Sequence, residues 1–176
     1  MGWSAIIGGR KTDKAQAALA VVRRLEAKGL VVRGFLQREV LSANGDVAGW
    51  DVERLGGAER TVLARTSPEP ELCDYTFDPA GFAQAAAWAS EPCDVVVVSG
   101  VGKLEEEKKG HFPVLERLAR AERGPHVLAV VRDSSLTRVG LALPDASGWV
   151  EWPCDDAALD AFADEVARAA RASGCS

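Results

Sequence analysis

Four consecutive valines stand near the middle of the chain, between Asp94 and Ser99. A run of β-branched residues without polar side chains predicts a strand buried on both faces, as in a parallel sheet covered by helices. Apolar runs at 5–7 and 126–132 resemble it, and segments with helical periodicity separate the three. The sequence therefore predicts an α/β fold with a mostly parallel sheet.

The remaining elements follow from periodicity and from turn residues. Extended segments at 30–40 and 47–54 flank the turn at 43–46, which predicts a β-hairpin inserted after the first helix. Further short strands are expected at 61–64, 73–77 and 148–152. Helices are expected over 12–28, from Asp78 onward, over about 105–123, near 134–141 and from Asp155. With no internal repeat or linker, residues 1–176 are expected to form a single domain.

Composition excludes several classes of function. The net charge is -5, and the basic residues are scattered, which argues against nucleic acid as a partner. No cleavable leader and no apolar run of about 20 residues are evident, so we expect a cytoplasmic protein without membrane contact. The four cysteines contain no C-x-x-C pair, which argues against zinc and predicts reduced thiols in or near the core: Cys73, Cys93, Cys154 and Cys175.

The segment "GGRKTDKAQ", residues 8–16, lies between the first expected strand and the first expected helix. In an α/β fold, this is where a phosphate-binding loop would sit. Lys14 is present, but the residues beside it are not those that such a loop requires.

Several segments resemble, in order and spacing, a family of small P-loop nucleoside triphosphatases first recognised in thermophiles and also found in animals. They are "GFLQREVLSANGDVAGWDVERLGG" (34–57), "LAR" (63–65), "CDYTFDPAGF" (73–82) and "DVVVVSGVGKLEEE" (94–107). The resemblance covers about residues 3–170 and implies a P-loop NTPase-like three-layer sandwich and Mg²⁺-dependent nucleotide hydrolysis. A weaker likeness, strongest in "GKLEEEKKGHF", connects the chain to an uncharacterised bacterial group linked to molybdenum enzymes.

The resemblance places Gly8 and Lys14 at the first glycine and the lysine of G-x-x-x-x-G-K-[ST]. The glycine before the lysine has become Asp13, and the Ser/Thr after it has become Ala15. The family's acidic pair has become Ser99 and Gly100. Ala15 removes the hydroxyl ligand of Mg²⁺, and the two other changes remove the acids for metal and attacking water. Asp13 adds a negative charge where phosphate would lie.

Two interpretations of the loop stay open. It could remain a metal-free anion site, built from Gly8, Gly9, Arg10, Lys11, Thr12 and Lys14. Alternatively, Asp13 caps the helix and pairs with a neighbouring cation, leaving a closed, empty loop. A motif shifted to Lys11 and Thr12 has too few residues before its lysine to form the loop.

Four other residues match the family pattern and are candidates for ligand or partner contact: Arg38, Glu39, Lys103 and Glu105. The alternatives are an exposed strand pair for Arg38 and Glu39, and a helix start for Glu105. The run 105–109 is expected to be a solvated helix face. His111 and His126 fit no catalytic constellation and are expected to be satisfied structural residues.

Five tryptophans would favour a protein interface if exposed and a core if buried: Trp3, Trp50, Trp88, Trp149 and Trp152. The resemblance implies that an Asn-Arg pair helps to hold the base near 149–152, but "EWPCDD" contains neither residue.

The sequence thus favours a degenerate nucleoside triphosphatase that binds a protein partner or a small anion without catalysis. The alternative is a divergent nucleotide phosphohydrolase with a non-standard loop. No cofactor, metal ligand or catalytic residue is expected under the first hypothesis, and Mg²⁺ and nucleotide enter only under the second.

Overall fold

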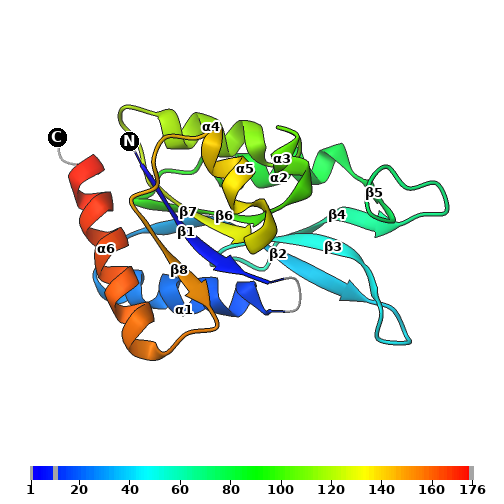
Figure 1. The fold of residues 1–176 in the computed structure, drawn as a ribbon, viewed down its shortest axis with the longest axis horizontal. Coiled ribbons are helices and arrows are strands. Elements are labelled where there is room, and N and C mark those ends of the chain that lie inside the picture. Colours follow the sequence, from blue (N-terminus) through cyan, green and yellow to red (C-terminus); the bar gives the residue numbers. More distant parts are fainter. Residues whose placement is uncertain (1, 10–11, 175–176) are drawn as a thin grey trace.

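In a computed structural model of the chain, which describes residues 2–9 and 12–174, the molecule is a three-layer α/β sandwich (Figure 1). Its eight-stranded sheet has the order β5-β4-β3-β2-β6-β7-β1-β8. The strands are β1 (Trp3–Gly8), β2 (Val32–Leu41), β3 (Val47–Arg54), β4 (Arg60–Thr66), β5 (Tyr75–Phe77), β6 (Val95–Val101), β7 (His126–Arg132) and β8 (Gly148–Trp152). The predicted fold class is confirmed.

The sheet has a parallel part and an antiparallel part that meet at β2. Strands β2, β6, β7, β1 and β8 are parallel neighbours, whereas β2 to β5 pair antiparallel. The predicted hairpin is β2–β3, and the short strands expected after it extend it into a four-stranded meander that projects from the parallel part (Figure 1).

Helices cover both faces of the parallel part. They are α1 (Lys14–Ala27), α2 (Pro79–Trp88), α3 (Lys103–Glu106), α4 (Phe112–Arg120), the 3-10 turn η1 (Asp133–Ser135), α5 (Leu136–Leu141) and α6 (Asp156–Gly174). Helices α1 and α6 lie together on one face, and α2, α4 and α5 lie on the other (Figure 1).

Successive side chains of a strand point to opposite faces of the sheet, which explains why both faces are apolar. Val95 and Val97 belong to the cluster that includes α1 and α6, whereas Val96 and Val98 belong to the cluster that includes α2 and α4. All four valines are fully buried, as expected for a central strand. The four-valine run therefore supplies both cores at once.

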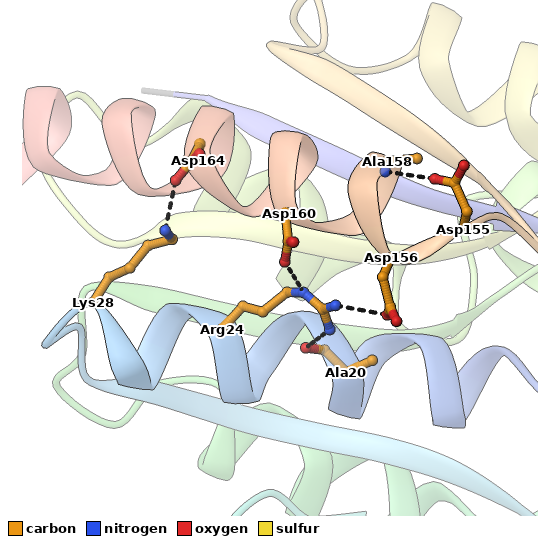
Figure 2. A network of polar contacts seen from close by, with 8 residues as sticks. All are labelled: Ala20, Arg24, Lys28, Asp155, Asp156, Ala158, Asp160 and Asp164. Carbon is orange, nitrogen blue, oxygen red and sulfur yellow. Dashed lines mark hydrogen bonds and ion pairs between the residues drawn. The ribbon is translucent and has the colours of Figure 1, made fainter.

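Charged residues join α1 to α6 outside the apolar contact. Arg24 donates to Asp156 (2.8 Å) and Asp160 (2.6 Å), and Lys28 pairs with Asp164 at 2.6 Å (Figure 2). The carboxylates that pair with Arg24 are 89% and 65% exposed, so the two Arg24 pairs are worth about 1 kcal/mol or less. They set the register of the two helices on a contact that burial already stabilises.

The prediction of one charged helix over 105–123 is wrong. The chain forms α3, then a turn, then α4, with positive φ at Lys108 (60°) and Gly110 (61°). Glu105 is buried and does not belong to a solvated helix face. Among the described residues, no helix is long and apolar enough to cross a membrane.

Candidate functional site

A cavity of about 910 Å³ lies where β1, β6 and β7 end, beside the antiparallel meander. In open α/β sheets, ligands bind outside the carboxyl ends of the parallel strands, where these ends and the loops after them leave a crevice. The lining includes Thr12, Lys14, Arg38, Glu39, Lys103 and Glu105 of the predicted site residues. The fold thus brings the loop, the hairpin and the segment after β6 to one site.

The loop before α1 is closed by its own side chains. Lys14 Nζ donates to the carbonyl oxygen of Gly9 at 2.6 Å, and Thr12 Oγ1 donates to the same oxygen at 2.8 Å. A Cβ on Gly8 would come within 2.7 Å of Thr12 Oγ1 and 2.9 Å of Lys14 Cγ. Asp13 is the N-cap of α1, because its carboxylate accepts from the backbone N–H of Gln16 at 3.0 Å.

This geometry agrees with the capping interpretation of Asp13 made from the sequence. Asp13 is exposed, and no described cation forms an ion pair with it. Arg10 and Lys11, the two other cations predicted for the anion site, lie outside the described residues.

The backbone at the positions of the family's acidic pair disfavours a carboxylate in place of Gly100. Gly100 lies in a β-bulge of β6 with φ at +79°, a conformation that favours glycine. A Cβ there would overlap Oε1 of Gln37, whose amide from β2 fills the space beside Gly100. Ser99 is 3% exposed at the same strand end.

Three cations face the cavity without ion-pair partners among residues 2–9 and 12–174: Lys14, Lys103 and Arg132. Burial and the neighbouring Arg132 lower the pKa of Lys14, and nearby carboxylates, Asp133 and Glu39 among them, offset part of this shift. An anion between Lys14 and Arg132 would relieve the repulsion between them.

Arg132 is the site residue that sequence reasoning missed. It is the last residue of β7 and is half-buried, and its guanidinium carbon would lie 4.0 Å from a Cβ on Gly102. The available signal was an arginine at the carboxyl end of a buried parallel strand, at the edge where such sheets bind ligands.

Glu105 holds the segment after β6 in place. It is 3% exposed, and its carboxylate accepts from the backbone N–H groups of Gly102 and His111, both at 2.8 Å. Burial raises the pKa of Glu105 to about 7, although these two hydrogen bonds favour its ionised form. We therefore assign Glu105 a structural role, and Lys103 beside it remains exposed and lines the cavity.

On the meander, Arg38 pairs with Glu53 across the hairpin at 3.4 Å, and the adjacent Glu39 is exposed. Only Glu39 is exposed as the alternative of an exposed strand pair expects, since Arg38 is half-buried; both residues line the cavity.

The histidines differ from the expected satisfied core residues. His126 is satisfied in part, through a 2.9 Å contact between its Nε2 and Ser4 Oγ. His111 is 2% exposed and lines the cavity, and neither of its ring nitrogens has a hydrogen-bond partner in the described chain. Burial lowers the pKa of His111 to about 3, so its ring is neutral.

The tryptophans and cysteines divide between core and surface. Trp3 and Trp88 are buried, Trp50 and Trp152 are half-buried, and Trp149 on β8 is 60% exposed. Cys73 is exposed, so the expectation of a thiol in or near the core is wrong for it. Cys93 and Cys154 are half-buried and free, and Cys175 lies outside the described residues.

A family model described as "Protein of unknown function (DUF2478)" matches residues 4–138. The chain belongs to this family. No functionally curated protein matches the sequence.

Two solved structures share the fold of this DUF2478 chain. A human cancer-related nucleoside triphosphatase, determined in solution, is similar with a TM-score of 0.67 at 17% identity, covering 99% of this chain and 100% of that one. The crystal structure of THEP1 from the hyperthermophile Aquifex aeolicus gives a TM-score of 0.65 at 16% identity, with coverage of 93% and 96%. The predicted resemblance to small P-loop NTPases is thus confirmed for the fold.

The residues of this DUF2478 protein do not fit the Mg²⁺-nucleotide that the resemblance implies. Ala15 offers no hydroxyl ligand, and the amide of Gln37 fills the space beside Gly100. No group of three or more His, Cys, Asp or Glu within 2–9 and 12–174 is arranged to hold a metal ion. The cavity is lined by three cations without ion-pair partners in the described chain, Lys14, Lys103 and Arg132, and by three carboxylates that likewise form no ion pair there, Asp13, Glu39 and Glu105.

Proposed function

We propose that this protein binds a small anion at the carboxyl edge of its sheet and does not hydrolyse nucleotides. The observation that carries the proposal is the group of unpaired cations formed by Lys14, Lys103 and Arg132 around the cavity. An anion there would gain charge-assisted hydrogen bonds, and Arg132 could offer two parallel N–H donors to a phosphate or carboxylate.

A small ligand suits this site better than a protein surface. The cations lie in a concave cavity rather than on a flat face, and cavities of roughly 300–1,000 Å³ are typical of small-molecule sites. Lys14 uses one of its three N–H donors on the carbonyl oxygen of Gly9, so we propose that the other two bind the anion. Under this proposal, a protein partner could bind differently to the anion-bound and anion-free forms of the loop.

The test is isothermal titration calorimetry with pyrophosphate, in EDTA and then in Mg²⁺. We expect metal-independent binding that weakens at least tenfold in Arg132→Ala, since a hydrogen-bonded charge contributes about 1.5–3 kcal/mol. Arg123→Ala is the matched control, because Arg123 is exposed, lies outside the cavity and has no ion pair in the described chain. Equal affinities for the natural protein and Arg132→Ala would reject the site.

A further variant tests the charge at Asp13. Asp13→Asn keeps a side-chain oxygen for the Gln16 N–H and removes the carboxylate charge, so we expect pyrophosphate to bind roughly fivefold more tightly or better. Asp13→Gly should behave in the same way, since glycine is a tolerable N-cap.

One observation favours the alternative, a divergent phosphohydrolase. The Asp133 carboxylate lies near the loop, with Oδ2 3.6 Å from where a Cβ on Gly9 would stand, and an acid there could orient water. Phosphate release from ATP or GTP in Mg²⁺ that is lost in Lys14→Ala and Asp133→Asn would establish this alternative and overturn the non-hydrolytic proposal.

A further inference from the structure

On the meander side, the cavity is lined by aromatic side chains and by two arginines, Arg38 and Arg60, that are already ion-paired. Its lining includes Trp50 from β3, Tyr75 and Phe77 from β5, Phe82 from α2 and His111. Trp50 and Tyr75 meet edge to face with ring centroids 6.5 Å apart, and Phe77 and Phe82 are 6.0 Å apart. Side chains from the meander and from α2 thus form one apolar wall.

His111 is the polar group within this wall. Its ring stands between Phe35 at 4.6 Å and Phe82 at 4.9 Å, measured between centroids, and its two nitrogens have no partner in the described chain. Leaving a buried donor or acceptor unpaired costs about 1–3 kcal/mol. A neutral imidazole presents one N–H donor and one lone-pair acceptor. Both nitrogens are buried, so a ligand with a polar edge would satisfy one of them after a shift of the side chains that separate the ring from the cavity.

From this division of the cavity, and resting on the anion site proposed above, we infer that the ligand is an anion that carries a planar heteroaromatic ring. The charged group lies against Lys14 and Arg132. The ring packs on the aromatic wall, and its polar edge hydrogen-bonds to His111. Apolar contact provides affinity, and the single buried hydrogen bond provides selectivity.

This position differs from the base site that the resemblance implies. That site would lie near residues 149–152 on β8, and no residue of β8 lines the cavity. The aromatic wall is on the meander side of the loop, so the ring extends toward β3 and β5 rather than toward β8.

The experiment compares monophosphates that share a charged group but differ in the ring: ribose 5-phosphate, AMP, GMP and flavin mononucleotide. We expect at least one of the ring-bearing probes to bind tenfold or more tightly than ribose 5-phosphate by calorimetry. The purine and flavin arms distinguish the two sources of a heteroaromatic ring. Equal affinities for all four probes would overturn the inference.

Two variants link the ring preference to the wall. His111→Phe keeps a ring of similar size between Phe35 and Phe82, and Trp50→Leu removes the indole; each should reduce the preference to about twofold without changing pyrophosphate binding. Trp149→Leu is the control, because Trp149 is exposed on β8 and outside the cavity. A ring preference that survives in both wall variants would overturn the inference.

Alkylation of Cys73 gives an independent measurement if a wall variant unfolds. Cys73 is exposed and lines the cavity, so a bound ring-bearing probe should slow its modification by iodoacetamide in the natural protein. Protection by AMP, GMP or flavin mononucleotide but not by ribose 5-phosphate supports the inference, and unchanged rates with a bound ring-bearing probe contradict it.

The two proposals fail separately. Pyrophosphate that binds through Arg132, together with equal affinities for all monophosphates, would reject the ring and leave the anion site. A ring-bearing probe that binds through His111 but is insensitive to Arg132→Ala would reject the anion site and, with it, the orientation inferred here.

Discussion

Replacing Glu105 with glutamine should change the pH dependence of stability. Burial raises the pKa of this carboxyl from about 4.5 to about 7, so the folded protein holds the proton more tightly than the unfolded chain. The stability from this group is therefore fully present below about pH 4.5 and is lost as pH rises toward 7.

The magnitude follows from the two pKa values. Between pH 5 and pH 8, ionisation of Glu105 should reduce the free energy of unfolding by about 2.5 kcal/mol. Glutamine cannot ionise, but it has one acceptor oxygen for the two N–H groups that the carboxylate accepts, which costs about 1 kcal/mol at every pH. Glu105→Gln should therefore be less stable than the natural protein at pH 5 and more stable at pH 8.

Urea unfolding followed by tryptophan fluorescence across this pH range gives the measurement. Comparing the variant with the natural protein removes the opposite contribution of His111 and His126, whose pKa values are lowered by burial. Glu122→Gln is the matched control, because Glu122 is exposed and unpaired in the described chain. A stability difference that does not vary with pH would refute the reasoning, since it would mean that the two N–H donors keep the buried carboxylate ionised throughout.

Three further predictions concern the fold and the thiols. Gly34→Ala should reduce the free energy of unfolding by about 3 kcal/mol or more, because Gly34 has φ +115° and its Cβ would clash with the carbonyl oxygen of Val97. Gly29→Ala, whose Cβ would stand in open space, should cost only about 1 kcal/mol. Thermal melts measure both, and similar costs would contradict this prediction. Arg24→Ala should cost about 1 kcal/mol or less in urea unfolding, and less still at molar salt; a salt-independent loss would argue for packing. By peptide mass spectrometry, iodoacetamide should modify exposed Cys73 before Cys93, whose pKa burial raises to about 11; the reverse order would refute the assignment.

The parallel part of the fold could be predicted because its signals are local. The valine run gave β6, and the predicted strand 148–152 coincides with β8. Asp78 before Pro79 gave the start of α2, where the aspartate accepts from the N–H of Ala80. The break between α3 and α4 was missed because it depends on a carboxylate that leaves the helix surface to bind the N–H of His111, which helical periodicity cannot reveal.

The candidate site was predicted only in part, for a similar reason. Lys14, Arg38 and Lys103 are fixed by register and do line the cavity. Arg132 and His111 depend on which strand ends and which helix lie beside the loop, and those neighbours come from the order of strands in the sheet. In the sequence, Arg132 and His111 are far from the loop, and nothing there shows that they lack ion-pair or hydrogen-bond partners.

The four replacements in and around the loop, Asp13, Ala15, Ser99 and Gly100, together change the charge and the metal ligands of the site. In a nucleotide hydrolase, the acids at the end of β6 hold the cation that neutralises the phosphates. Here Gln37 places an amide beside Gly100, and the carboxylates that act on Lys14 are instead those of Asp133, Glu39 and Asp13. A ligand that brings negative charge without its own metal ion suits such a site, and Asp13 at the rim reduces the affinity for that charge. On the function proposed above, the anion would therefore occupy the position of the phosphate site without a metal ion.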